Sequence, residues 1–436
     1  MDAAPVRAVT AENPAAAAES MRTKKGTESH FNIITAMITR NVIAMTMTGF
    51  LTLPLMAQEE VPAVGDLLQN INSLAPDEDA PSYKRKASEK YGTEWYADMA
   101  YGLWNTEKVP GVTRHTNLAL VHAVFDQQLI EDNANGGTWL RVEFSGTWGL
   151  DRESAQSDTV FADLVGNTTY VHGEHWGAHD GVFPEVSLRH HFAGKRACII
   201  AGMVNLTNYF DAVSIANDSF SSFVNLGFIN STILPLVDSN LGAVLQVELS
   251  RNSYAMVGVS RTGCTAGYNP FNSDICDGYA VVGEYGRIMA DGAVTIRINP
   301  FYTSADVDLD DGKGENRRQN AGLVGSVEYT PCERVTLYSR AGFAAKQYLR
   351  SSAEFTVGTH VNLIPSREDD FFGISYGVFK AQTPAEHHRE HVLEAVYSLQ
   401  LNDYLKVVPH VQYVANPAYS TEDEAFIWGV QTVFSF

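Results

Sequence analysis

Histidines have the most metal-like spacing in this sequence, and they fall into two groups: His172, His175 and His179, and His387, His388 and His391. Imidazoles are common zinc ligands, so three within a short stretch could form part of a metal site. The first group lacks the HExxH order of a metalloprotease and lies in a loop-like stretch. We therefore predict no metal site, and we interpret the second group as a solvated loop at the start of a strand.

An acidic stretch at 306–316, DVDLDDGKGEN, has the composition of a calcium-binding loop. It lacks the full DxDxDGx5E spacing, so we interpret it as an acidic surface loop. The sequence has no P-loop and no GxGxxG dinucleotide fingerprint. An outer-membrane lipase or protease barrel is the alternative enzyme class, but no Ser/His/Asp group stands out. We predict a protein with no cofactor and no catalytic site.

Two of the four cysteines lie close together in a turn-rich stretch. Cys264 and Cys276 bound the segment CTAGYNPFNSDIC, and no histidine flanks them at a zinc-finger spacing. In an oxidising compartment this pair is expected to close a loop disulfide. Cys198 and Cys332 are interpreted as single thiols.

The composition limits the possible partners and classes. The formal net charge of −20 argues against nucleic acid and against anionic lipid headgroups. The mean hydropathy of −0.13 excludes an α-helical membrane protein. A β-barrel needs only every second residue of a strand to be apolar, so the chain can still cross a membrane.

Residues 1–57 have the features of a targeting segment. The apolar stretch NVIAMTMTGFLTLPLMA follows Arg40 and ends in the small residue Ala57, which predicts a secretory signal cleaved after Ala57. Met21 opens a conventional basic start, MRTKKG, and we predict that it is the true start. A membrane anchor that stays attached is the alternative. Residues 58–93 are expected to form a periplasmic segment or a plug.

From about residue 94 to the end, segments with alternating apolar and polar side chains are separated by turn residues. The last segment, EAFIWGVQTVFSF, places Phe426, Trp428 and Phe434 on one face. Aromatic residues at both ends of an apolar face are typical of outer-membrane strands. The terminal Phe436 is the expected signal for the barrel assembly machinery. We predict an all-β, antiparallel transmembrane barrel of about sixteen strands in the bacterial outer membrane and its lipid.

The connections between these segments alternate between short turns and long loops, as in bacterial barrels. Two of them, 150–182 and 206–240, are long enough to suggest a function. A barrel of this size has a wide bore, and a loop folded inward would narrow it. The candidate constriction residues are Trp176, Asn205, Asn208, Tyr209, Asp211 and Asn217.

The alternation also predicts which side chains line the bore, because charges on the lipid face would cost roughly 2–4 kcal/mol each. The candidate pore-lining and sugar-binding residues are Arg141, Glu143, Arg189, Arg297, Tyr338, Arg340, Glu394 and Lys406. Mixed donors and acceptors suit a neutral solute with many hydroxyls. The alternative for each arginine is structural: it pairs with a nearby Glu or holds the inserted loop.

Two stretches resemble the carbohydrate-selective porin family, OprB. In 196–235 the matching residues are Gly202, Asn205, Tyr209, Phe210, Ala216, Asn217, Phe223, Asn225, Phe228, Asn230 and Pro235. In 388–436 they are Glu394, Tyr397, Gln400, Leu401, Tyr404, Leu405, Pro409, Gln412, Tyr413, Asn416 and Pro417. Met203 stands where the family usually has a lysine after Gly202, which removes one expected pore charge.

This resemblance implies a sixteen-stranded outer-membrane channel for mono- and small oligosaccharides, narrowed by inward loops and by lumen Arg, Glu and aromatic residues. Two alternatives remain open on the same barrel: a general or anion/organic-acid diffusion porin, and a structural or adhesive barrel with a plugged bore. A soluble all-β lectin is a third alternative. The sequence leaves open whether the channel is a monomer or a homotrimer.

Overall fold

The computed structural model describes residues 82–107, 115–132, 134, 136–150, 165–172, 179–236, 239–262, 278–304, 319–345, 351–381 and 385–436. The chain divides into two compact units, 1–58 and 59–436, and every described residue belongs to the second. Some sequence predictions lie outside the described residues and stay predictions: the signal at 1–57, the acidic stretch 306–316, Trp176 and the Cys264–Cys276 disulfide.

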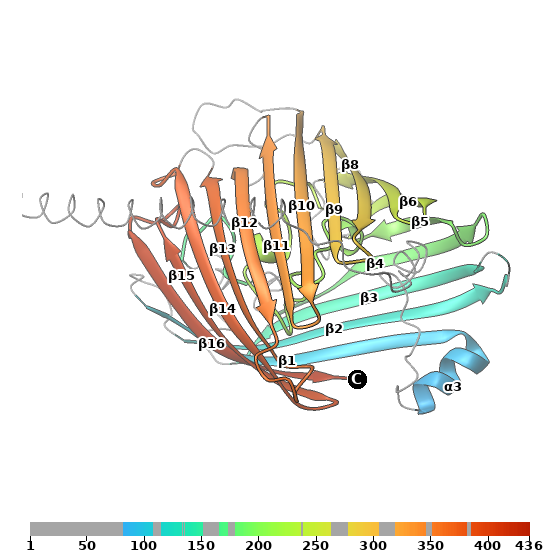
Figure 1. Ribbon diagram of the computed structural model, residues 1–436, viewed down its shortest axis with the longest axis horizontal. Helices are drawn as coiled ribbons and strands as arrows, with labels where there is room; N and C mark the ends of the chain where they lie inside the picture. Colours follow the sequence, from blue (N-terminus) through green and yellow to red (C-terminus); the bar gives the residue numbers. More distant parts are fainter. Residues whose placement is uncertain are drawn as a thin grey trace, which may run out of the picture. The chain divides into compact units, whose positions relative to one another are not determined.

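The described residues form sixteen antiparallel β-strands that close into a barrel (Figure 1). The strands are β1 (Thr93–Glu107), β2 (His115–Ile130), β3 (Thr138–Gly149), β4 (His179–Phe192), β5 (Ala197–Val204), β6 (Asn240–Ser250), β7 (Ser253–Thr262), β8 (Gly278–Met289), β9 (Val294–Thr303), β10 (Asn320–Cys332), β11 (Val335–Ala344), β12 (Ser351–Val361), β13 (Phe371–Ala381), β14 (Arg389–Asn402), β15 (Leu405–Ala415) and β16 (Glu424–Ser435). The predicted all-β barrel is confirmed. In the described part of the chain, no helix is long and apolar enough to cross a membrane.

The period-2 alternation of the sequence separates two faces of the wall. On β16, Trp428 and Phe434 are exposed on the outside, at 44% and 42%, whereas Ile427 and Gln431 of the same strand are fully buried inside. Closure leaves no free sheet edge, because β1 pairs with β16 in a register that sets Leu103 opposite Val430. Every strand therefore presents an apolar outer face and a mixed inner face, as a bilayer requires.

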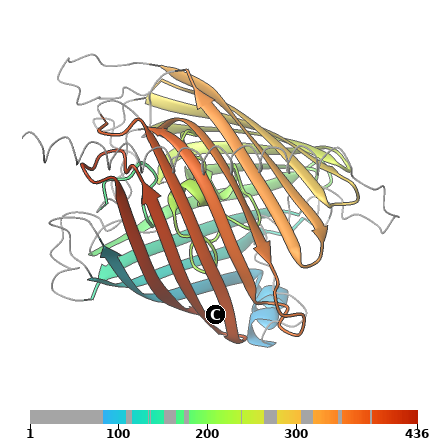
Figure 2. The same ribbon diagram turned by 60° about the vertical axis from the view of Figure 1, so that its left-hand side comes forward.

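The two ends of the barrel differ in their connections. One end has tight turns, such as the β8–β9 turn, where Asp291 and Gly292 have positive φ values of 52° and 91°. The short helix α3 (Ser82–Tyr91) and the C-terminus lie at this end (Figure 2). There the backbone of Phe436 pairs with that of Ala97 in both directions, at 2.9 and 3.2 Å. Because bacterial barrels keep short turns in the periplasm, the opposite end faces the outside.

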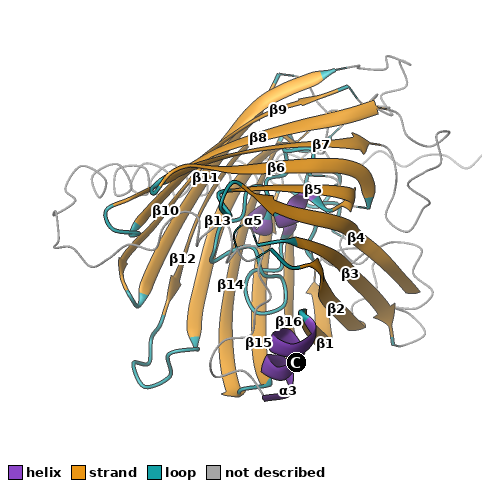
Figure 3. Cartoon of the chain, turned by 90° about the vertical axis from the view of Figure 1, so that its right-hand side faces the viewer, coloured by secondary structure: helices purple, strands orange, loops and turns teal. Residues whose placement is uncertain are grey.

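The connection between β5 and β6 folds back into the barrel. We call its residues 205–236 the constriction loop. It contains the short helices η2 (Leu206–Asn208) and α5 (Leu226–Ile229), and Figure 3 shows α5 inside the ring of strands. Phe223 and Phe228 of the loop are fully buried in an apolar cluster with wall residues of β1, β2, β11 and β13–β16, which are neighbours on one side of the barrel. The loop is thus a packed part of the interior.

Candidate functional site

The constriction loop is held mainly by carboxylates of the inner wall. Six glutamates on six different strands accept hydrogen bonds from it: Glu143 (β3), Glu185 (β4), Glu284 (β8), Glu328 (β10), Glu354 (β12) and Glu394 (β14). A loop without regular structure has backbone N–H groups that need acceptors, and an ionised carboxylate only accepts. The inward-facing glutamates of the strands therefore determine where the loop lies.

The first part of the loop is fixed on β3 and β4. Asn208 donates through Nδ2 to Glu143 Oε2 at 2.6 Å, and the Tyr209 hydroxyl donates to Glu185 Oε1 at 2.5 Å. Asn205 caps η2 by accepting from the N–H of Thr207 at 3.2 Å. Asn205, Asn208 and Tyr209 are three of the six predicted constriction residues, and they lie together against β3 and β4.

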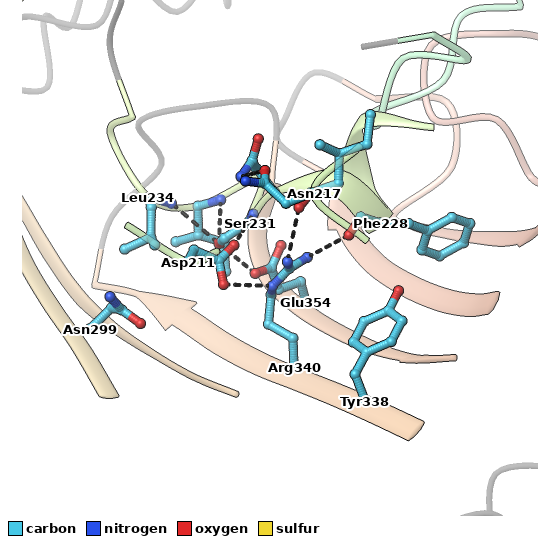
Figure 4. Close-up of polar contacts among 12 residues, drawn as sticks. Asp211, Asn217, Phe228, Ser231, Leu234, Asn299, Tyr338, Arg340 and Glu354 are labelled. Carbon is cyan, nitrogen blue, oxygen red and sulfur yellow. Dashed lines mark hydrogen bonds and ion pairs between the residues drawn. The ribbon is translucent and has the colours of Figure 1, made fainter. Parts of the chain in front are cut away.

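Arg340 on β11 forms the central anchor of the loop (Figure 4). Its Nε donates to Asp211 Oδ1 at 3.0 Å, and its terminal nitrogens donate to three carbonyls of α5, those of Gly227, Phe228 and Ile229, at 3.2–3.3 Å. Both charged side chains of the pair are fully buried. A buried ion pair of this kind is held in place because separating it would leave two uncompensated charges.

Asp211 also ties together two distant parts of the loop. Its second oxygen, Oδ2, accepts from the N–H of Ser231 at 2.6 Å, and its own N–H donates to Glu284 at 3.0 Å. Asp211 has a positive φ of 59°, so the chain turns sharply here. Burial raises the pKa of Asp211 to about 6, although Arg340 acts in the opposite direction.

Two further predicted pore arginines pair with an aspartate of the wall. Arg141 donates to both oxygens of Asp126, at 2.8 and 2.7 Å, and Arg189 Nη1 lies 3.9 Å from the same carboxylate. All three side chains are almost completely buried. This cluster joins β2, β3 and β4 and leaves little of either guanidinium exposed to a solute.

The other predicted pore residues also lie on the inner wall. Tyr338 is buried and shares a 2.7 Å hydrogen bond with Ser375. Arg297 is buried beside Tyr254, Glu328 and Glu284. The sequence thus gives the correct face for all eight residues, but most of them lie behind the loop. Only Lys406 is half-buried, with Nζ 3.1 Å from Ser221 Oγ of the loop.

The tip of the loop, by contrast, is open to the interior. Asn217 and Asp218 are exposed. The neighbouring Phe220 stacks on the His122 ring of β2, with ring centroids 6.2 Å apart. His122 is 22% exposed and lies 3.1 Å from Glu143 and 3.3 Å from the Tyr96 hydroxyl.

Asp98 on β1 completes this group. It is half-buried and interacts electrostatically with Asp218, His122 and Lys406. Asp98, His122, Asp218 and Lys406 are therefore close enough to interact, and we call this place the eyelet. We define it as these four residues with Tyr96, which bonds His122, and Asn217, which precedes Asp218 and accepts from Asn230 Nδ2 at 3.3 Å. Sequence reasoning missed Tyr96, Asp98, His122 and Asp218. The alternation along β1 and β2 was the signal that could have found the first three.

The candidate metal and catalytic residues have other positions. His172 is buried inside the barrel, 3.1 Å from Gln431 and edge-on to Trp104. Among the described residues, no group of three or more His, Cys, Asp or Glu is placed to hold a metal ion.

Residues 373–377, GISYG, have the GxSxG spacing of a hydrolase nucleophile, a match that the sequence analysis missed. They lie within β13 and not at a strand-to-helix turn. Among the described residues, Ser375 bonds Tyr338 and the Val357 carbonyl, and no histidine. The spacing therefore has no catalytic context here.

Comparisons with known proteins agree with this architecture. Residues 156–436, more than half of the chain, match the model of the carbohydrate-selective porin, OprB family. The high-pH structure of Pseudomonas putida OprB aligns over 81% of this chain and 96% of its own, with 13% identity and a TM-score of 0.66, which shows a shared fold.

Two other matches are more limited. An uncharacterized protein of Aquifex aeolicus is 36% identical over 58 residues, which are 13% of this chain, and the match spans about a fifth (19%) of that curated relative. A loop-deletion mutant of OmpT, an outer membrane protein of Vibrio cholerae, aligns over 79% of this chain and 99% of its own, with 10% identity and a TM-score of 0.49. From the family match, the chain belongs to the OprB family of carbohydrate-selective porins, which are channels of the bacterial outer membrane.

Proposed function

We propose that mono- and small oligosaccharides cross this porin by passing the eyelet. The observation that carries this proposal is the contrast in exposure: the loop tip and the facing wall keep polar groups open to the interior, whereas the arginines and glutamates around them are buried. A solute moving down the bore would therefore meet Asn217, Asp218 and His122 before any predicted arginine.

The chemistry of the eyelet suits neutral polyols. Carboxylates of Asp98 and Asp218 accept from sugar hydroxyls, and the Asn217 amide both donates and accepts. Tyr96 and His122 bring aromatic rings to the eyelet, and their exposed parts can pack against the apolar CH surface of a pyranose. Several weak contacts of this kind allow binding without trapping the solute. The presence of Lys406 beside two aspartates gives the eyelet both signs of charge, which favours a sugar over an anion or organic acid.

The buried arginines have a different role in this proposal. Arg340 holds the constriction loop, and Arg141 and Arg189 brace the wall beside it. They act as positioning residues for the eyelet, in keeping with the structural alternative for each of them. Arg297, Glu143, Tyr338 and Glu394 belong to the same support.

Partial block of ion current by sugar tests the function. In planar bilayers, glucose or a short oligosaccharide added to one side is expected to lower the single-channel current of the wild type. Asp218→Asn keeps the side-chain acceptor for the N–H groups of Phe220 and Ser221 and should weaken the block several-fold. Asp403→Asn, in the exposed β14–β15 turn, is the matched control.

Three outcomes separate the proposal from its alternatives. A single-channel current that sugar does not change would indicate a general diffusion porin. The absence of any pore would indicate a structural or adhesive barrel. An unchanged sugar block in Asp218→Asn would move the solute path away from the eyelet.

We also infer that Phe436 is the residue through which the assembly machinery takes up the barrel. Its backbone pairing with Ala97 supports this, because the same terminal strand must close the ring. Deletion of Phe436 is expected to reduce the amount of heat-resistant barrel in the outer membrane. Cross-linking in membranes would decide between monomer and homotrimer.

A further inference from the structure

Two cations stand side by side on the outer face of the barrel. Lys380 of β13 and Arg389 of β14 are directly opposite each other in the antiparallel register. Both side chains are exposed. Like charges at directly opposed positions destabilise a strand pair, so this arrangement calls for a compensating anion.

The chain does not provide that anion among the residues that the structure describes. Neither Lys380 nor Arg389 forms an ion pair there. Two acidic residues lie in neighbouring segments, and neither pairs with Lys380 or Arg389. Glu424 accepts from the Tyr413 hydroxyl at 2.8 Å, and Glu386 is exposed in the loop before β14. An anion from outside the chain could therefore bind between Lys380 and Arg389 and compensate their charges.

The residues below the pair show the depth at which it lies. Along the same outer faces, Ile374 and Leu393 are exposed and apolar. Tyr376, Val378 and His391 come next, with a 2.8 Å hydrogen bond between the Tyr376 hydroxyl and His391, and Lys380 and Arg389 follow at the loop end of the strands. Lys380 lies six residues after Ile374, about 20 Å along an extended strand. This order of apolar, amphipathic and charged residues follows the profile of a bilayer from hydrocarbon to headgroup.

We propose that Lys380 and Arg389 bind the phosphate groups of lipopolysaccharide in the outer leaflet. The pair lies at the end that carries the long loops, and therefore at the level of that leaflet's headgroups. The Arg389 guanidinium can hold two phosphate oxygens, and the Lys380 ammonium adds a second charge. The net charge of −20 does not oppose this binding, because charges more than about 10 Å away are screened by salt. The electrostatic potential at the bound phosphate is therefore set by Lys380 and Arg389.

Binding of diphosphoryl lipid A to the purified, detergent-solubilised porin tests the site. The double variant Lys380→Gln/Arg389→Gln is expected to weaken binding about tenfold, since each basic residue contributes to attraction of an anionic headgroup. Arg287→Gln is the matched control, because Arg287 is an exposed outer-face cation at the short-turn end. Lipid A without its phosphates should bind the wild type as weakly as diphosphoryl lipid A binds the double variant.

Heat-modifiable mobility on gels checks that every variant is folded. Equal binding by wild type and double variant, or equal loss in Arg287→Gln, would overturn the proposal. Phosphatidylglycerol binding as tightly as lipid A would overturn the choice of glycolipid. Sugar block of the channel should be unchanged in the double variant, so this test is independent of the eyelet.

Discussion

Two aspartates of the constriction loop, Asp211 at its base and Asp218 at its tip, have opposite roles. At the base, Asp211 is fully buried and bonds Arg340 and Ser231. At the tip, Asp218 is exposed and bonds only backbone N–H groups of its own turn in the described structure. Burial, and not residue type, thus separates the residues that support this pore from those that face the solute.

The largest expected effect is at the base. Arg340→Met removes the cation and leaves Asp211 buried without its partner, which costs roughly 3–5 kcal/mol. The loop should leave its position, and single-channel conductance should rise while the sugar block disappears. Arg334→Met, in an exposed turn of the same hairpin, should conduct as the wild type does. Unchanged conductance in Arg340→Met would show that the other anchors suffice.

A smaller effect is expected at a single glutamate. Glu394 accepts from the N–H groups of Val224 and Asn225, at 2.9 and 3.1 Å. Glu394→Gln replaces one acceptor oxygen by a donor and should cost roughly 1–3 kcal/mol. The measurement is hydrogen exchange of residues 220–230 in detergent, with Asn402→Asp at the exposed end of the same strand as control. Faster exchange confined to this segment is expected, and wild-type exchange would contradict the anchoring role.

A charge change at the eyelet should alter selectivity and leave the barrel intact. Lys406→Gln removes a positive charge near Asp98 and Asp218. The lumen then becomes more negative, and the ratio of cation to anion permeability should rise about twofold at low salt. Reversal potentials in a salt gradient measure this ratio. An unchanged ratio would place Lys406 outside the ion path.

The smallest effect concerns a short turn far from the pore. Asp370 accepts from Arg367 and from the Gln400 N–H, and these hydrogen bonds hold its pKa below the ordinary value of 3.8. Its stabilising contribution is therefore present above pH 4 and is lost as pH falls through the lowered pKa. Asp370→Asn should lower the unfolding temperature slightly at pH 7 and leave conductance unchanged. A difference that persists equally at pH 2 would contradict an ionic cause.

Much of the fold could be predicted from the sequence, because alternation and turn residues are local signals. The strand of Trp428 and Phe434 and the inward face of Arg141 follow from a period of two. The period does not show whether an inward-facing side chain is buried behind the constriction loop or exposed in the bore. Arg340 and Asn217 were both expected at the pore, but the path of the loop buries one and exposes the other. That path depends on glutamates from six strands, and no local pattern reveals such contacts.

The six wall glutamates have a consequence for engineering this channel. Glutamates on six strands accept hydrogen bonds from the constriction loop. The position of the loop, and with it the width of the bore, therefore depends on the whole ring of strands. Grafting a loop from another porin would fail unless its N–H groups met the same oxygens. To change the size of solute that the channel accepts, Asn217 and its neighbours at the tip should be substituted while all six glutamates are kept.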